Sequence, residues 1–159
     1  MKVVKWFGIV VVVVFLGLQV FSPQKTNPPV HDGQTIQATT QVPPDVQSIL
    51  QRACYDCHSS NTTWPWYSYI APVSWLLVDD VNEGRRHLQF SEWGTYPYRK
   101  MMRRLQDINE QVSEGEMPLK SYLLMHPEAR LSDADKQLLC DWAERERARM
   151  AAAQPEDPR

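Results

Sequence analysis

The chain has 159 residues, a length typical of one domain with accessory segments. It carries 17 basic and 19 acidic residues without a dominant basic stripe, which argues against nucleic acid as a partner. Six tryptophans and six tyrosines are many for so short a domain, and they suit a pocket that encloses a large, flat, apolar ligand.

Two lysines precede an apolar run over residues 6–21 at the N-terminus. This order predicts a signal anchor or transmembrane helix over residues 1–22, with the lysines inside the bacterial inner membrane and the following domain in the periplasm. A helix of about 16 residues spans about 24 Å, slightly less than a hydrocarbon core of about 30 Å. Cleavage at the end of the run stays open, but Pro23 would follow the cut, so we expect an uncleaved anchor.

Residues 23–44 are rich in proline, glutamine and threonine and lack apolar periodicity, which predicts a disordered linker. We expect the folded domain to cover residues 45–150, followed by a disordered tail over residues 151–159. Asp45 follows two prolines and suits the start of a first helix. Apolar and thiol side chains then recur at helical spacing on one face of that helix: Val46, Ile49, Leu50, Ala53, Cys54 and Cys57.

The first helix carries Cys54-Tyr55-Asp56-Cys57-His58, the attachment signature of a c-type haem. Two thiols one helical turn apart can reach the two vinyl groups of one porphyrin. The histidine that follows is then placed to take the proximal position on the iron. The motif predicts one covalent haem, with Cys54 and Cys57 as thioether residues and His58 as proximal ligand.

Other uses of two neighbouring cysteines fit the sequence less well. A redox dithiol follows a buried strand, whereas the residues before Cys54 have a helical pattern. A zinc site needs four ligands, and besides the three in the motif only Cys140 offers a further thiol. On a helical wheel Cys140 falls opposite the apolar face of the last helix, so we expect an exposed thiol there.

An irregular segment follows the motif, because Pro65 excludes a helix interior or a central strand. Its aromatic side chains either fill the core or form a wall beside the haem, and Trp64 and Trp66 are the candidates for the second role. Three further helices are predicted: one from Pro72 to near Gly84, one from Tyr98 to near Gly115, and one that begins at the capping box of Ser132 and Asp135. The fold class is therefore all-α.

The pattern resembles a small one-domain cytochrome c, and more closely the bacterial haem-binding domain family, over roughly residues 45–145. The resemblance rests on these runs: Cys54-Tyr55-Asp56-Cys57-His58, Trp64-Pro65-Trp66-Tyr67, Ile70-Ala71-Pro72-Val73-Ser74-Trp75, Asn82-Glu83-Gly84-Arg85-Arg86, Phe90-Ser91-Glu92-Trp93, Glu116-Met117-Pro118 and Tyr122-Leu123-Leu124-Met125-His126-Pro127. It implies a small helical domain around one covalent haem c, on the exported side of the membrane. It implies no settled reaction.

The sixth iron position has several candidates: Met117, Met125, His126, His87, Met101 and Met102. In the cytochromes c that the chain resembles, the distal methionine comes from a loop before the last helix, which is where Met117 lies. Pro118 limits the movement of that loop. His126 is the alternative distal ligand, and it would give an iron with two imidazole ligands. Met101 and Met102 lie on a helix face that predicts core packing.

Arg85 and Arg86 are candidates for contacts with the haem propionates, because guanidinium groups pair well with carboxylates. They could equally be a charged pair at the end of a helix. The leading hypothesis is a membrane-tethered periplasmic cytochrome that passes single electrons between redox proteins, rather than an enzyme. The alternative is a peroxidase-like haem enzyme or a gas or redox sensor with an open or labile sixth iron site.

Overall fold

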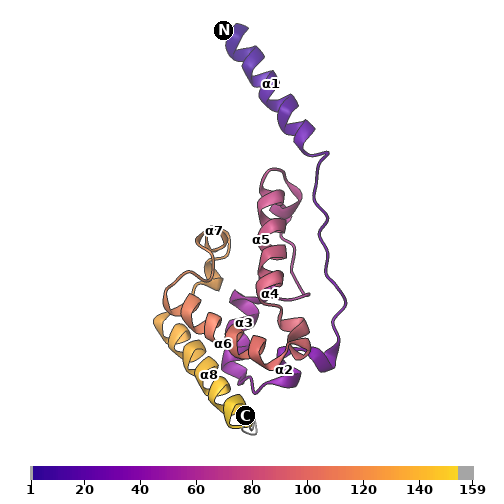
Figure 1. Cartoon of the computed structure of the whole chain (residues 1–159). Helices are drawn as coiled ribbons and strands as arrows, with labels where there is room; N and C mark the ends of the chain where they lie inside the picture. Colours follow the sequence, from indigo (N-terminus) through magenta and orange to yellow (C-terminus); the bar gives the residue numbers. More distant parts are fainter. Residues whose placement is uncertain (1, 154–159) are drawn as a thin grey trace.

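The structure, a computed structural model, describes residues 2–153, and its regular elements within this range are all helical. The predicted all-α class is therefore confirmed. In chain order the elements are α1 (Lys2–Leu18), η1 (Asp32–Gln34), α2 (Ile36–Thr39), α3 (Pro44–Ala53), α4 (Tyr55–His58), η2 (Trp66–Tyr69), α5 (Val73–His87), η3 (Phe90–Thr95), α6 (Tyr98–Ser113), α7 (Lys120–Leu123), η4 (Pro127–Ala129) and α8 (Asp133–Ala152) (Figure 1).

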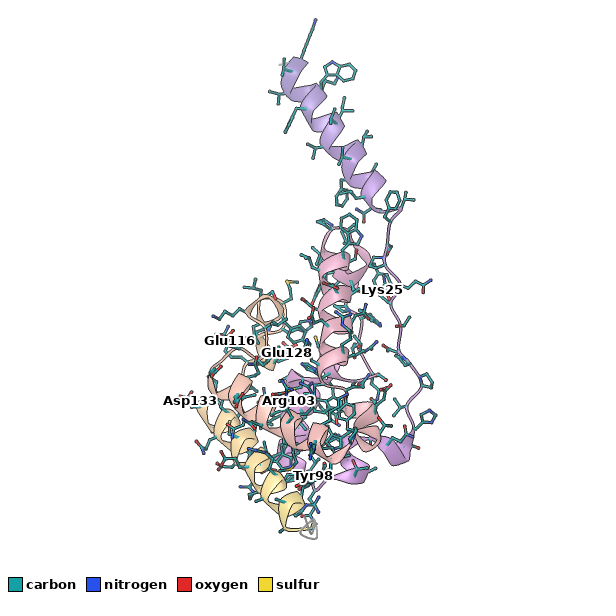
Figure 2. All side chains as sticks on the ribbon, in the orientation of Figure 1. Lys25, Tyr98, Arg103, Glu116, Glu128 and Asp133 are labelled. Atoms are coloured by element: carbon teal, nitrogen blue, oxygen red, sulfur yellow. The ribbon has the colours of Figure 1, made fainter. Side chains whose placement is uncertain are left out.

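Helix α1 stands apart from the other helices, and its apolar side chains are exposed all round (Figure 2). It has 17 residues and ends at Leu18, where the next residues form tight turns back to the helix. No helix within residues 2–153 is long and apolar enough to cross a membrane. The transmembrane helix predicted over residues 1–22 is therefore not supported, because the helix stops before the apolar sequence does.

The second half of the predicted disordered linker over residues 23–44 is folded into short helices. Helices η1 and α2 both pack against η3, and Ile36 of α2 is completely buried in the core. A Cβ on Gly94 would lie 2.9 Å from Thr39 Cγ2, so the close contact between η3 and α2 depends on this glycine. The folded unit therefore begins before Asp45. Ile36, whose neighbours in the sequence are mostly polar, packs this additional segment against the core.

The core lies where α3, α6 and α8 meet. The amphipathic α6 packs against α8, and α3 also contacts α8. Leu50, Leu105 and Leu139 are at most 1% exposed, one from each helix. Trp142 is also buried, and its indole Nε1 donates to Gln41 O at 2.8 Å, which fixes the chain just before α3. These three helices form the rigid base on which the candidate site is built.

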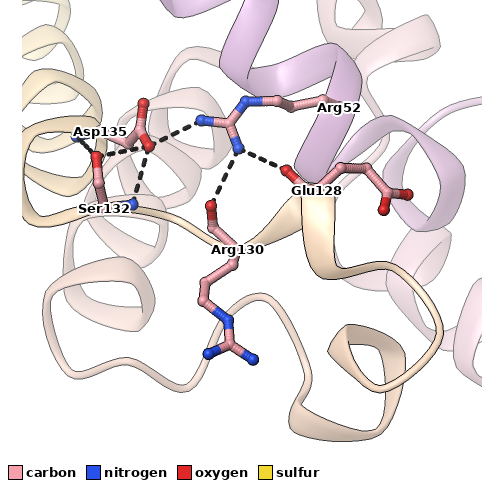
Figure 3. Close-up of polar contacts among 5 residues, drawn as sticks. All are labelled: Arg52, Glu128, Arg130, Ser132 and Asp135. Carbon is pink, nitrogen blue, oxygen red and sulfur yellow. Dashed lines mark hydrogen bonds and ion pairs between the residues drawn. The ribbon is translucent and has the colours of Figure 1, made fainter.

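The predicted capping box at the start of α8 is confirmed, and an arginine from α3 joins it (Figure 3). Asp135 N donates to Ser132 Oγ at 3.1 Å, and Ser132 N donates to Asp135 Oδ2 at 2.9 Å. Arg52 pairs with Asp135 at 2.8 Å and donates to the carbonyls of Glu128 and Arg130 at 3.0 and 3.2 Å. Arg52 therefore fastens the end of α3 to the chain that leads into α8.

The ends of two predicted segments lie elsewhere in the structure. Helix α5 continues past Gly84 to His87. Helix α8 runs to Ala152, so the predicted tail over residues 151–159 begins inside a helix. The rest of that tail, residues 154–159, lies outside the described residues.

Candidate functional site

The cysteine motif lies at a break between two helices rather than on one continuous helix. Helix α3 ends at Ala53, and Cys54 has φ −127° and ψ −34°, outside the helical region. The short α4 follows, with Cys57 N and His58 N both donating to Cys54 O, at 3.2 and 2.9 Å. The break at Cys54 separates α4 from α3, which corrects the single helix predicted from the apolar spacing.

Helix α4 lies against α5 at a glycine. A Cβ on Gly84 would lie 2.7 Å from Cys57 O and 3.3 Å from Cys57 Cβ, closer than ordinary van der Waals contact. Only glycine allows the two backbones to approach this far. Gly84 was predicted to lie at a helix end, although an isolated glycine within a helical pattern also indicates such a close approach of two backbones.

The close approach determines which ring nitrogen of His58 carries a proton. His58 Nδ1 lies 3.0 Å from Gly84 O and 3.1 Å from Leu88 O. Carbonyl oxygens only accept, so Nδ1 donates to both and Nε2 keeps a free lone pair. Burial lowers the pKa of His58 from its usual value, which favours this neutral form. A neutral imidazole whose other nitrogen donates to a backbone carbonyl is the usual state of a metal-ligating histidine.

A cavity of about 580 Å³ opens beside the motif, within the range of about 300–1,000 Å³ that is typical of ligand sites. Cys54, Cys57 and His58 line one side, and Met117 lines it from the loop after α6. Apolar side chains from α3, α6 and α8 also line the cavity, among them Leu50, Ile108, Val112 and Leu139. The four residues predicted to bind one haem thus line the same largely apolar cavity: Cys54, Cys57, His58 and Met117.

The two thiols are not those of a reactive dithiol. Burial, with a contribution from Cys57, raises the pKa of the Cys54 thiol to about 12. Burial and the carboxylate of Asp56 raise the pKa of Cys57 to about 12 as well. Redox dithiols instead have a thiol whose pKa is lowered, to about 3.5–7.5. Both thiols therefore stay protonated at neutral pH.

The zinc alternative is wrong for the described part of the chain. Within residues 2–153, no three side chains of His, Cys, Asp or Glu are grouped so that they could hold a metal ion. Cys140 instead packs partly buried against the core, and its thiol donates to Asn109 O at 3.7 Å. The expectation of an exposed thiol is also corrected, because α6 covers that side of α8.

Residues 13–145, more than half of the chain, match the family model of the haem-binding domain. The chain belongs to this family. The predicted haem-binding domain is thereby confirmed at the level of the family. Searches of curated proteins and of solved structures found no match.

The residues at the cavity fit a haem. The lining supplies two thiols, an imidazole with a free Nε2, a thioether and a wide apolar surface. It also contains the guanidinium of Arg104, whose Nε is buried without a hydrogen-bond partner. A buried donor without an acceptor is costly, and the carboxylate of a bound ligand would satisfy it.

The arginines at the cavity are not those expected from the sequence. Arg103 and Arg104 of α6 line it, and Arg104 pairs with Asp107 through Nη1. Arg85 donates instead to Ser59 O at 2.8 Å and to the chain that follows α1. Arg86 is exposed and pairs with Glu83 of its own helix. Arg104 could have been found by its spacing, since it lies three residues after Met101 and four before Ile108 on the apolar side of α6.

Both ring nitrogens of His126, the alternative distal ligand, are occupied. Its Nδ1 donates to Glu128 Oε1 at 3.0 Å, and its Nε2 accepts from Tyr67 Oη at 2.6 Å. The ring also stacks on Tyr122, which does line the cavity. His126 is therefore bound to neighbouring side chains, and Tyr122, on which it stacks, is a lining residue that no sequence pattern had indicated.

The remaining candidates lie in different places. His87 lines the cavity, but its side chain is 65% exposed and pairs with Glu83. Met125 is 52% exposed, and neither it nor Met101 nor Met102 is a lining residue. Trp64 donates from Nε1 to Asn27 Oδ1 at 3.2 Å, and Trp66 is 69% exposed. Neither tryptophan lines the cavity, where Phe90 and Tyr122 supply the aromatic rings.

Proposed function

We propose that this haem-binding domain holds one haem c covalently and carries single electrons between redox proteins. Cys54 and Cys57 are the attachment residues, His58 is the proximal iron ligand and Met117 is the distal ligand. The observation that carries the proposal is that all four side chains line the same cavity.

The chain's own residues account for attachment without an oxidant. Cys54 and Cys57 would hold the haem through two thioethers, each equivalent to the addition of one S–H to one vinyl C=C bond, with the S–C bond on one vinyl carbon and the hydrogen on the other. The high pKa of about 12 keeps each thiol protonated until the addition occurs. Since the two cysteines are on either side of one turn, a single porphyrin can take both.

The surroundings of His58 and Met117 suit an electron carrier. The two carbonyls at His58 Nδ1 hold the imidazole in one orientation, and a fixed ligand limits the rearrangement between oxidation states. The thioether of Met117 raises the reduction potential relative to a second imidazole. Bound haem supplies one-electron oxidation and reduction of its iron.

The basic side chains of α6 are the ones placed to receive the haem carboxylates. Arg104 offers the buried Nε–H that has no partner, and Arg103 lies beside it at the cavity. Asp80 and Glu83 line the cavity from α5, so a carboxylate on that side would meet like charges. The proposal therefore replaces Arg85 and Arg86 with Arg103 and Arg104.

We further propose that the domain is exported to the periplasmic side of the bacterial inner membrane and attached there by α1. The support is the sequence of α1, with two lysines near its start and no acidic residue, and the solvent exposure of its apolar side chains. The chain should pellet with membranes and resist a high-salt wash. Its recovery in the soluble fraction would contradict this attachment.

Optical spectra of the purified ferric and ferrous protein test the central proposal. Covalent haem should survive denaturing electrophoresis, and ferric protein should show the weak near-infrared band of sulfur–iron ligation. Met117→Ala should lose this band, and the reduction potential should fall. Met125→Ala is the matched control, because Met125 lies away from the cavity, and it should keep the band.

Other outcomes would favour the alternative function. If the wild type lacks the near-infrared band and binds carbon monoxide readily, the sixth site is open. A haem enzyme or sensor would then replace the electron carrier. If only His126→Ala alters the ligation, the distal ligand is His126 and Met117 is not.

A further inference from the structure

Helix η2 and the first turn of α5 carry exposed apolar side chains, here called the aromatic patch: Trp66, Tyr69, Val73, Trp75 and Leu76. Trp66 is 69% exposed, Tyr69 61% and Leu76 68%. Helix η2 packs against α5, so these side chains lie over one end of the folded unit. Large apolar side chains grouped on a surface generally mark a contact with another molecule or a membrane.

The aromatic patch is fastened to the end of α1. The Gln19 amide makes two hydrogen bonds with Ala71, donating to its carbonyl at 3.2 Å and accepting from its N–H at 2.9 Å. Trp75 Nε1 donates to Phe21 O at 2.6 Å. Three bonds thus fix the point where the chain leaves α1 against the loop before α5 (Figure 1).

The chain beyond this point stays attached to the same face. Lys25 Nζ lies 4.4 Å from the centre of the Tyr69 ring, a cation–π contact with a residue of the aromatic patch. Asn27 Nδ2 donates to Thr62 O at 2.9 Å, and Arg85 holds Thr26 O at 2.7 Å. The segment between α1 and η1 is therefore not a free tether, and α1 cannot move far from the patch while these contacts hold.

We infer that the aromatic patch is a docking surface for the lipid bilayer that receives α1, with its tryptophan and tyrosine rings in the headgroup region. This inference rests on the membrane attachment proposed above. An apolar helix exposed on all sides needs an apolar environment. Because the C-terminal end of α1 is bonded beside the aromatic patch, the environment that surrounds this end also contacts the patch. Tryptophan and tyrosine are enriched at membrane interfaces, and Lys25 can extend its amine to the lipid phosphates.

Docking at the aromatic patch would set the distance of the haem cavity from the bilayer. Leu76 lies in the patch and Gly84 lines the cavity, both on α5. Eight residues of helix separate them, a distance of about 12 Å along the axis. Helix α5 thus acts as a rigid spacer that holds the cavity close to the membrane surface.

The experiment uses the full chain with its haem, carrying Cys140→Ser so that no native thiol outside the haem can be labelled. A nitroxide is attached at Leu76→Cys or at the control Glu92→Cys, an exposed residue of η3 that lies outside the patch. Each protein is bound to vesicles of phosphatidylethanolamine and phosphatidylglycerol. Collision rates with oxygen, which dissolves in lipid, and with a water-soluble nickel chelate are then measured.

The label at residue 76 should show a several-fold higher ratio of oxygen to nickel collisions than the label at residue 92. Equal ratios in protein that floats with the vesicles would overturn the docking surface while leaving the attachment by α1 intact. Protection at residue 76 from both reagents would also overturn it, since a protein partner would then cover the patch. Protein that does not float with the vesicles would overturn both the docking surface and the membrane attachment by α1. The covalent haem is tested separately, by the optical spectrum.

Discussion

Replacement of Gly84 by alanine tests the close contact between α4 and α5. Within a helix, alanine is more stable than glycine by about 1 kcal/mol, so helix propensity alone predicts that Gly84→Ala stabilises the domain. In the folded protein, however, the new Cβ would lie 2.7 Å from Cys57 O, and the nearest backbone of α4 would have to move.

The expected net effect is destabilising. Overpacking against a fixed neighbour costs about 1–3 kcal/mol. Moving α4 from α5 also weakens the hydrogen bond from His58 Nδ1 to Gly84 O, at a cost of about 1 kcal/mol. After subtracting the gain in helix propensity, Gly84→Ala should lower the free energy of unfolding by about 1–3 kcal/mol, which corresponds to a Tm lower by about 4–12 °C.

Thermal unfolding of the haem-loaded protein, followed by circular dichroism, measures this shift. Gly33→Ala is the matched control, because a Cβ at Gly33 would meet nothing within 4 Å. It should change the stability by no more than about 0.5 kcal/mol. A Tm for Gly84→Ala equal to or above that of the wild type would refute the close approach of α4 and α5.

Three further predictions test other parts of the site and fold. Changing Cys54 and Cys57 together to alanine should abolish haem that survives denaturing electrophoresis. The double variant should also fold poorly, because the bound haem fills much of the core. Normally coloured, stable protein would contradict the attachment. Arg104→Gln should lower the reduction potential, because the positive charge that it removes disfavours the oxidised haem. Arg85→Gln should leave the potential unchanged. If a redox titration finds the shift for Arg85→Gln and none for Arg104→Gln, the arginine assignment made from the sequence is the correct one. Burial of the Asp135 carboxyl raises its pKa, but Ser132 and Arg52 outweigh this and hold the pKa below its usual range. The resulting stabilisation is present above the unfolded pKa of about 4 and is lost as the pH falls through the folded pKa. Asp135→Asn should therefore lower the Tm at neutral pH by a few degrees, for a loss of about 1 kcal/mol. The gap in Tm between the wild type and this variant should close in acid. A gap that persists at pH values well below 4 would assign the loss to another cause.

The amino-acid sequence by itself determined the features that depend on neighbouring residues. The run from Cys54 to His58, with the runs that resemble the haem-binding domain family, predicted that family, which the family model confirms. Haem attachment through Cys54 and Cys57 stays a prediction. The helices α6 and α8 followed from apolar periodicity, and Ser132 with Asp135 marked the start of α8. Each of these signals lies within a few residues, where chain geometry leaves few alternatives.

Only the tertiary structure decided which distant residues meet. Ile36 lies in a polar stretch that predicted a linker, yet it is buried in the core. Arg104 of α6, rather than Arg85, lines the cavity, and Arg85 bonds instead to the chain after α1. His126 is bound by Tyr67, far away in sequence. The physical reason is that periodicity shows which face of a helix is buried, whereas the packing of helices against one another determines what that face contacts.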